Sequence, residues 1–495
     1  MLNKKIIVIG AGIGGLAAAL KLAHNGLDVT VIEQHSYAGG KIRSMASSEG
    51  PVDAGPTVFT LKNLFDSFFS GIGEDLNQHL ELSAEPLIAN HFWPDDSSLK
   101  LYSHYEKNIE AIRQFSGPKS AKEYEKFTNL TSELFNAFKA PIILSPNPSI
   151  INLIKNTFLK ANKLLPALLP WLTLSRLCKS QFSDPRLQQL FSRYATYVGG
   201  SPYDSPAILS LIWQAESNGI WRIKGGMNQL PKVMQSLGKA RGVEFRFNEK
   251  IEEIMKTNQR VSGVRLKGGE TILSDVVIYN GDPKAILNGL LGKKISNSIT
   301  RKNVFPRSLS AYVWSFSAST ENNNLCHHNV FFNNKYESEF IDIANNRMPI
   351  NPALYVCAQD RGSDMSLKNI ERFEIIMNAG PIKQPQKKFR EEYNLCKEIT
   401  FRSLKEMNLE FNPIPQIENL TTPTMFNQMF PGSNGSLYGL NPNRMMATFK
   451  RAKLKSMIQG LYLVGGGVHP GPGVPMAMLS GQHAAETILR DHFLI

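Results

Sequence analysis

KIIVIGAGIGG, residues 5–15, is the stretch that decides the fold of this chain. Residues 6–9 are an apolar, largely β-branched run typical of a buried parallel strand, and a helical apolar pattern follows the glycines as far as Asn25-Gly26. A second strand, residues 28–32, ends directly before Glu33. This βαβ unit with a G-x-G-x-x-G turn predicts a Rossmann-like nucleotide-binding domain, with the pyrophosphate at the helix N-terminus.

The residues after the second strand indicate which nucleotide is bound. Glu33 lies where a carboxylate accepts hydrogen bonds from a ribose diol and would repel a 2′-phosphate. Glycine-rich turns are common, but here the strand, the helix and the acidic residue all have the required spacing. Gly39-Gly40-Lys41 and then Arg43 follow, an extension that a plain NAD domain does not require. We therefore expect FAD rather than NAD.

Composition sets outer limits on the class of protein. At 495 residues the chain is long enough for two or three domains. The net charge of +13 favours anionic surroundings, either nucleic acid or anionic lipid. The four cysteines lie more than thirty residues apart, so neighbouring cysteines form no metal site or redox pair. We expect no metal and a reduced, cytoplasmic setting.

The sequence contains no expected targeting or membrane-spanning segment. The N-terminus is strand and glycine turn rather than a signal peptide. No apolar run reaches the roughly 18 residues that a helix needs to cross a bilayer.

Residues 135–183 differ from the rest of the chain because they contain six basic residues and no Asp or Glu. Apolar runs lie between the charges, and Trp171 follows the longest of them. This composition is typical of helices that lie on an anionic membrane surface, and a pair of core helices with solvated lysines is the alternative. Nucleic acid is a weaker interpretation, because no aromatic residues alternate with the basic ones and no nucleic-acid motif is present. The basic residues are Lys139, Lys155, Lys160, Lys163, Arg176 and Lys179.

Later segments return to the α/β pattern. Residues 274–279 form a strand that leads into Asn280, and residues 461–464 form a buried strand followed by Gly465-Gly466-Gly467. The nucleotide-binding domain is therefore predicted to be discontinuous. The expected division is a nucleotide-binding domain of residues 1–88, 221–290 and 456–495, and a second, α+β domain of residues 89–220 and 291–455 that holds the substrate.

Two further segments allow both a structural and a functional interpretation. Residues 52–58 form either an ordinary turn or a wall of the flavin site. Residues 182–221 are rich in aromatic residues, which most often means a hydrophobic core.

With these motifs in place, the chain resembles the bacterial carotenoid desaturases of the phytoene desaturase type, which share a flavin fold with amine oxidases. The blocks that carry the resemblance are residues 10–43, 52–60, 225–230 and 461–485. Within the family, residues 53–60, 435–439 and 466–471 look most like the 1-hydroxycarotenoid 3,4-desaturases.

The resemblance implies an FAD-binding domain of the amine-oxidase and phytoene-desaturase type, with Ile251 beside the adenine. Lys41 stands where many relatives carry arginine, which keeps the charge but loses a bidentate donor. The cofactor-binding residues expected from the motif and the resemblance are Ala11, Gly12, Gly14, Gly15, Glu33, Gln34, Gly40, Lys41, Thr57, Val58, Ile251, Asn280, Gly466, Val474, Pro475 and Met476.

The resemblance also implies an activity, a substrate and a location. The expected reaction introduces the 3,4 double bond next to the hydroxylated end of a 1-hydroxycarotenoid, by hydride transfer to flavin N5 and loss of a proton. Such a long apolar polyene would enter from the inner face of the cell membrane, to which residues 135–183 would attach the protein. The electron acceptor stays open between oxygen and a quinone.

Two residues are candidates for the proton acceptor, His469 in the expected flavin loop and Glu216 among the aromatic residues. A structural role is an equal alternative for each.

Three other functions also stay open: a phytoene or dehydrosqualene desaturase, a flavin amine oxidase, and a non-catalytic protein that binds FAD or lipid.

Overall fold

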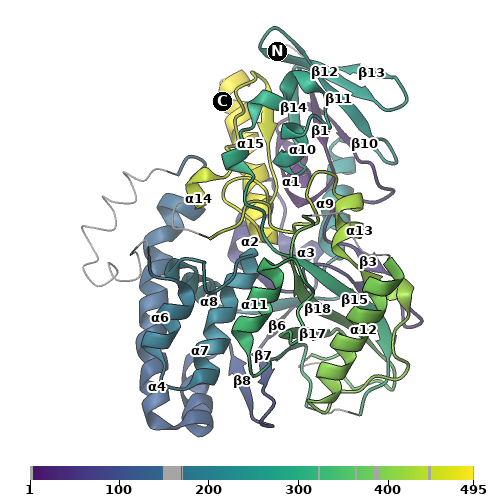
Figure 1. Ribbon diagram of the computed structural model, residues 1–495. Helices are drawn as coiled ribbons and strands as arrows, with labels where there is room; N and C mark the ends of the chain where they lie inside the picture. Colours follow the sequence, from purple (N-terminus) through teal and green to yellow (C-terminus); the bar gives the residue numbers. More distant parts are fainter. Residues whose placement is uncertain are drawn as a thin grey trace.

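A computed structural model describes residues 4–148, 169, 171–321, 324–362, 365–383, 389–443 and 447–493. It has an upper part built on a parallel sheet and a lower part in which a larger sheet lies beside a group of helices (Figure 1). No helix of the described ranges is long and apolar enough to cross a membrane.

The upper part is organised around a five-stranded parallel sheet with the order β10-β2-β1-β14-β20. Its strands come from distant parts of the sequence because β1 pairs with both β2 and β14, and β14 pairs with β20. The sheet therefore joins segments separated by more than 200 residues. The strands are β1 (Lys5–Ile9), β2 (Asp28–Ile32), β10 (Glu244–Arg246), β14 (Val276–Tyr279) and β20 (Leu461–Leu463).

Both faces of this sheet are covered, which explains the uninterrupted apolar character of its strands. Ile6 and Val8 of β1 face the helices α1 (Ile13–His24), α9 (Gln229–Ala240) and α15 (Val474–Phe493). Ile7 and Ile9 face the opposite way, toward a three-stranded antiparallel sheet. That smaller sheet contains β11 (Ile251–Thr257), β12 (Arg260–Leu266) and β13 (Thr271–Leu273).

The lower part contains a seven-stranded sheet with the order β19-β15-β18-β17-β16-β7-β8. Its pairs are antiparallel except for β16 with β7, so the sheet is mixed. Helix α12 (Phe389–Lys405) covers one face, and α11 (Tyr336–Ala344) lies on the other. The strands are β7 (Leu87–Phe92), β8 (Ser98–Tyr102), β15 (Ser310–Ala318), β16 (His328–Phe331), β17 (Leu354–Ala358), β18 (Glu371–Ala379) and β19 (Leu420–Thr421).

The helices beside this sheet pack around an aromatic core. Tyr124, Phe127, Phe191 and Trp213 are all fully buried there. The long helix α4 is interrupted at Gly117, where φ is +87°, directly before Pro118. The elements of this group are α4 (Tyr105–Phe138), the π-helical η1 (Lys139–Ile143), α6 (Leu174–Gln181), α7 (Pro185–Ser192), η3 (Arg193–Val198), η4 (Ala207–Ser210) and α8 (Leu211–Ser217).

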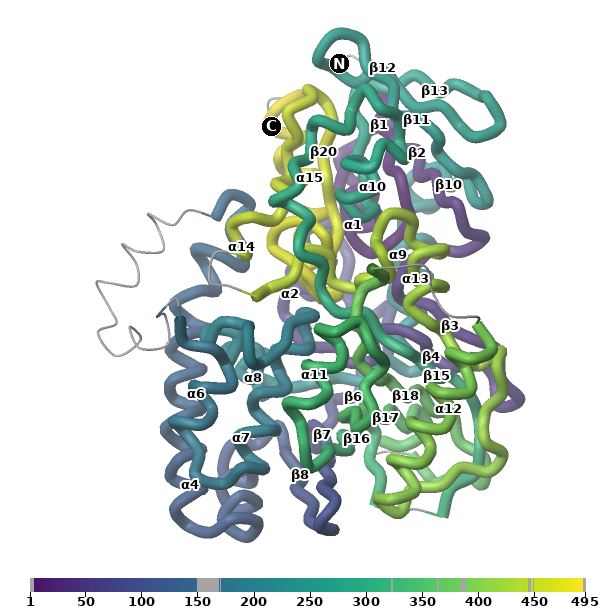
Figure 2. The backbone as a smooth tube through the Cα atoms, viewed as in Figure 1, coloured from purple at the N-terminus to yellow at the C-terminus, as the bar shows by residue number. Residues whose placement is uncertain are grey.

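Short elements connect the two parts (Figure 2). A small antiparallel sheet has the order β5-β9-β6, and a two-stranded one joins β3 and β4. The strands of these two small sheets are β3 (Ser44–Met45), β4 (Val52–Asp53), β5 (Phe59–Thr60), β6 (Leu82–Glu85) and β9 (Ile220–Ile223). The remaining short helices of the described residues are α2 (Lys62–Ser70), α3 (Leu76–His79), α10 (Pro283–Leu287), η5 (Lys293–Ser298), η6 (Arg301–Asn303), η7 (Ile417–Asn419), α13 (Pro423–Met429) and α14 (Ala447–Lys450).

The segment 135–183 is described only at its two ends. It begins as the end of α4 and η1, and it finishes in α6, whose Leu174, Leu177 and Cys178 are buried in the aromatic core. For α6, the core-helix alternative therefore describes the packing. Lys155, Lys160 and Lys163 lie outside the described residues.

Candidate functional site

A large cavity, of about 1220 Å³, lies where the carboxyl ends of the parallel strands face the lower part of the molecule. Pockets for one small molecule commonly measure roughly 300–1,000 Å³, so this cavity has room for more than one. Its lining includes the glycine turn after β1, the loop before α15, and residues of η3, α8, β17 and β18.

The glycine turn and the N-terminus of α1 face this cavity. Gly12 is the N-cap residue, and the first turn of α1 carries no acidic side chain that would occupy the free amides. A Cβ atom on Gly12 would lie 2.9 Å from Asn280 Nδ2, and one on Gly14 would lie 2.8 Å from the backbone nitrogen of Gly465. Only glycine permits these approaches, and the exposed amides suit a pyrophosphate.

Glu33 projects from the end of β2 and is 5% exposed. One carboxylate oxygen accepts a hydrogen bond from the backbone N–H of Ala11 at 2.8 Å, and the other accepts from that of His35 at 2.9 Å. The carboxylate is therefore held in place, and each oxygen has a second lone pair for a ribose hydroxyl.

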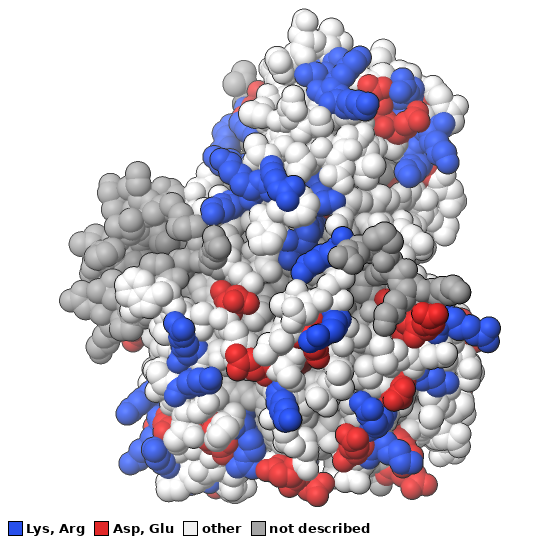
Figure 3. Space-filling view, in the orientation of Figure 1, with Lys and Arg blue, Asp and Glu red and all other residues white. Residues whose placement is uncertain are grey.

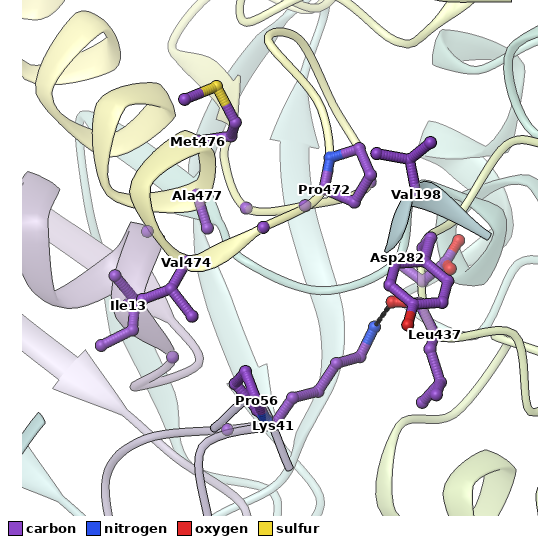
Figure 4. Close-up of a pocket in the computed structure, with 18 of the residues that line it drawn as sticks. Ile13, Lys41, Pro56, Val198, Asp282, Leu437, Pro472, Val474, Met476 and Ala477 are labelled. Carbon is purple, nitrogen blue, oxygen red and sulfur yellow. Dashed lines mark hydrogen bonds between the residues drawn. The ribbon is translucent and has the colours of Figure 1, made fainter. Parts of the chain in front are cut away.

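Lys41 supplies a cation on another wall of the cavity. Its Nζ donates a hydrogen bond to the carbonyl of Leu437, across the cavity from Ile13 and Val474 (Figure 4). Burial lowers the pKa of Lys41 to about 8, although the negative charge of Asp282 works in the opposite direction. Because the protein neutralises so little of its positive charge, this ammonium group is suited to bind a phosphate anion.

Most of the predicted cofactor-binding residues line this one cavity. Ala11 and Gly15 are the two that do not: Ala11 contributes its N–H to Glu33, and Gly15 packs so closely that a Cβ atom would lie 2.2 Å from the carbonyl oxygen of Gly10. The residues that line the cavity are Gly12, Gly14, Glu33, Gln34, Gly40, Lys41, Thr57, Val58, Ile251, Asn280, Gly466, Val474, Pro475 and Met476.

The segment 52–58 forms part of the cavity wall. Pro56, Thr57 and Val58 line the cavity, and the Thr57 hydroxyl lies 2.7 Å from the hydroxyl of Tyr355 on β17. Asp53 lies behind this wall, where its carboxylate accepts a hydrogen bond from the backbone N–H of Met227 at 2.6 Å. The segment is therefore part of the cavity wall, and its contact with the flavin stays a prediction.

The two candidate proton acceptors lie in different surroundings. His469 does not line the cavity: its Nε2 bonds to the carbonyl oxygen of Ser145 at 2.7 Å. Burial lowers the pKa of His469, which keeps the imidazole neutral. This contact ties the loop before α15 to the residues after η1, so the geometry supports the structural role for His469.

Glu216, on α8, does line the cavity. One of its carboxylate oxygens accepts a hydrogen bond from the Tyr197 hydroxyl at 2.8 Å, and the other accepts a short hydrogen bond from Tyr194. Burial raises the pKa of Glu216, while the two tyrosines and Arg193 act in the opposite direction. The carboxyl group is therefore a stronger base than a solvated glutamate.

The cavity also has a long apolar end. Among the described residues, it is lined there by side chains that flank the stretch 149–168 and by residues of η4, α8 and α14. They are Phe135, Phe138, Ile142, Ile143, Leu169, Ile208, Leu209, Leu211, Ile212 and Phe449.

Several lining residues were missed by the sequence analysis. Arg193 and Tyr355 lie in stretches whose composition indicated only core, and Arg451 lies in a segment without a recognised motif. A basic residue between Phe191 and Tyr194 was the one available signal, since an arginine in an aromatic core needs a polar partner.

One group outside the cavity has side chains that suit a metal ion. His327, His328 and Cys357 place one ligand atom each within 4.8 Å of the others, which their sequence spacing did not indicate. His327 Nδ1 lies 2.8 Å from the carbonyl oxygen of Arg361, and the Cys357 thiol lies 3.7 Å from His327 Nε2. Hydrogen bonds thus already engage the side chains of His327 and Cys357. The absence of a metal stays a prediction. All four cysteines are free thiols.

Comparisons with known proteins agree with this geometry. The family described as flavin containing amine oxidoreductase matches residues 13–302. The chain is 45% identical over 487 residues to a hydroxyneurosporene desaturase from Cereibacter sphaeroides, covering 98% of each. It is 31% identical over 500 residues to a 1-hydroxycarotenoid 3,4-desaturase from a Flavobacterium species, covering 98% of this chain and 99% of the relative.

The fold also occurs among solved structures. Wild-type putrescine oxidase bound to putrescine aligns with a TM-score of 0.62 at 14% identity, over 99% of each chain. At this identity the likeness concerns the fold alone. The cofactor is FAD, since the matching family is flavin-containing and the open helix N-terminus, Glu33 and Lys41 fit its pyrophosphate and ribose.

We expect Glu33→Ala to weaken FAD binding, because it removes charge-assisted hydrogen bonds worth roughly 1.5–3 kcal/mol. Titration of the apoprotein with FAD, followed by flavin fluorescence, should show a dissociation constant higher by roughly 10- to 150-fold. Glu244→Ala, on the exposed surface of β10, is the matched control and should leave the affinity unchanged. An unchanged affinity in Glu33→Ala would contradict the ribose assignment.

Proposed function

The chain belongs to the bacterial carotenoid desaturases, within the flavin containing amine oxidoreductase family, and on this premise we propose that it desaturates the 3,4 bond of a 1-hydroxycarotenoid. The names of two relatives support a hydroxylated substrate: the hydroxyneurosporene desaturase and the 1-hydroxycarotenoid 3,4-desaturase.

The observation that carries the proposal is the continuity of the cavity. One end is the anion-binding glycine turn, and the other is a long apolar lining that reaches Phe138, Ile142 and Leu169. A soluble amine would need no such apolar length, whereas a polyene does. Burying a polyene there stabilises the complex by about 25 cal/mol for each Å² of apolar surface removed from water.

FAD, when bound, supplies the acceptor for the hydride that leaves the allylic carbon. The protein must then provide a base for the neighbouring proton, and we assign this role to Glu216. Its two oxygens accept hydrogen bonds from Tyr194 and Tyr197, yet a carboxylate has about four lone-pair sites, so capacity for the substrate proton remains. The apolar surroundings exclude water, which would otherwise compete for the same charge.

Replacing Glu216 by glutamine should remove this base and keep the shape of the side chain. We expect kcat to fall by roughly 100- to 10,000-fold, with FAD content unchanged. In the wild type, kcat/KM should fall as the pH drops through the raised pKa of Glu216, and the variant should lack this dependence.

Glu392→Gln is the matched control, because Glu392 is also buried and accepts a hydrogen bond from a tyrosine, Tyr312, at 2.7 Å, but lies away from the cavity. Near-wild-type kcat in Glu216→Gln would exclude Glu216 as the base.

The substrate assignment is tested with two carotenes that differ only in the tertiary hydroxyl. Leaving a buried polar group of the site without its partner costs about 1–3 kcal/mol, which corresponds to a preference of roughly 5- to 150-fold in kcat/KM for the hydroxylated form. Product formation is measured from each carotene in mixed micelles under identical conditions. Equal rates, or faster turnover of phytoene or dehydrosqualene, would favour a desaturase of unhydroxylated substrates instead.

The apolar end of the cavity supports attachment to the inner face of the cell membrane. Its lining flanks residues 149–168 on both sides, and that stretch carries Lys155, Lys160 and Lys163 without any acidic residue. Lysines and arginines also gather around the middle of the face shown in Figure 3. A substrate dissolved in the bilayer could enter such a cavity without crossing water.

We therefore expect the variant with Lys155, Lys160 and Lys163 changed to Glu to lose salt-sensitive binding to anionic liposomes, because each basic residue contributes about 1 kcal/mol near such a surface. Flotation at low and high salt measures this loss. The control for net charge changes Lys232, Lys239 and Lys267 to Glu. These three lysines are exposed and lie outside residues 135–183. Equal flotation of wild type and the first variant would refute attachment through this segment.

A further inference from the structure

Arg193, the first residue of η3, presents a guanidinium group to the cavity. Its side chain is half-buried, so it keeps accessible surface although it lies deep in the molecule. Its one side-chain hydrogen bond to the described residues is from Nη1 to the Tyr197 hydroxyl, at a long 3.3 Å. Because a guanidinium has five N–H donors, most of its donors are available to a ligand.

The acidic residues nearest to Arg193 are already engaged. Glu216 accepts hydrogen bonds from Tyr194 and Tyr197, and no carboxylate of the described ranges forms an ion pair with Arg193. Glu339 accepts from the N–H of Ala353 and from Asn378, each at 2.8 Å. Arg193 is therefore held mainly by the rings of Tyr197 and Tyr355, whose centroids lie 5.2 and 5.8 Å from its central carbon.

A cation in this place restricts what can lie beside it. A plain hydrocarbon end would cover the free donors without replacing their hydrogen bonds, which is costly in an apolar cavity. An oxygen-bearing end of the substrate, which can accept hydrogen bonds from these donors, is therefore favoured at Arg193.

The position of Arg193 relative to the cofactor residues fits this arrangement. Arg193 lies over the ring of Tyr355, whose hydroxyl is 2.7 Å from that of Thr57 on the cofactor wall. In a 1-hydroxycarotenoid, a single carbon separates the hydroxyl-bearing carbon from the 3,4 bond. A site for the hydroxyl must therefore adjoin the cofactor site, as Arg193 does.

We infer that Arg193 donates a hydrogen bond to the tertiary hydroxyl oxygen of the substrate and so selects hydroxylated polyenes and positions the 3,4 bond. This inference rests on the proposed function, and it identifies a specificity-determining residue of the same cavity. Tyr197 accepts a hydrogen bond from the guanidinium and donates one to Glu216, so recognition of the hydroxyl and acceptance of the proton share one hydrogen-bonded group.

The test compares wild type with Arg193→Met, which keeps a similar length but has no donor. Both are assayed with a 1-hydroxylated carotene and its unhydroxylated form. We expect the ratio of the two kcat/KM values to fall by roughly 5- to 100-fold in the variant, mainly through the hydroxylated substrate. Arg193→Lys, which keeps the charge with a different donor geometry, should retain part of the ratio.

Binding without turnover gives a second measurement. The holoenzyme with its flavin chemically reduced cannot accept the hydride, and its affinity for the 1-hydroxylated carotene, followed by the shift of the carotene absorption band, should fall in Arg193→Met and stay constant for the unhydroxylated carotene. Arg113→Met, at an exposed position of α4 away from the cavity, is the matched control. FAD content and melting temperature establish that each variant is folded, and Arg193→Leu, which also lacks a donor, replaces Arg193→Met if the latter is not.

The outcomes separate this inference from the proposed function. If wild type prefers the hydroxylated carotene and the Arg193 variants keep the same preference, the inference is wrong and the proposed function stands. If wild type shows no preference and binds both carotenes equally, the proposed function fails and the inference fails with it.

Discussion

The structure depends on the close approach of three chain segments at the carboxyl edge of the parallel sheet. The turn around Gly12 and Gly14, the side chain of Asn280 and the backbone of Gly465 meet at distances that leave no room for a Cβ atom. Asn280 Nδ2 also donates to the carbonyl oxygen of Gly10 at 3.0 Å, which fixes the turn to the neighbouring strand. Because all three segments follow parallel strands, the turn, the amides of α1 and the loop before α15 face one cavity.

The cavity combines two environments that ordinarily exclude each other. A dinucleotide needs charges and amides, and a polyene needs an apolar surface without unsatisfied polar groups. The protein separates them: Glu33 and Lys41 lie on the upper part, while Phe138 and Ile142 line the far end. Arg193 and Glu216 are ionisable groups at the junction, and both contact tyrosine hydroxyls.

Sequence analysis was most successful where a local pattern determines the structure. The strands on both sides of the glycine turn, the helix between them and the buried strand before Gly465 follow directly from residue order. Residues 274–279 were predicted as one strand, but β14 begins only at Val276. The Ser274 hydroxyl bonds to the carbonyl oxygens of Lys5 and Val276 there and turns the chain. The role of Arg193 depends on tertiary neighbours from β17 and α8, which no local pattern indicates.

The order of the strands has a consequence for how the protein is made. β1 and β2 are synthesised first, but their sheet also needs β14, whose Val276 pairs with Ile6, and β20. The carbonyl of Gly14 then packs against Gly481 of α15 so closely that a Cβ atom at that position would lie 2.1 Å away. During translation the ribosome must therefore deliver residue 481 before the first β-α-β unit reaches its final packing. The complete cofactor cavity therefore forms only after α15 has been synthesised, because the sheet depends on contacts between residues far apart in the sequence.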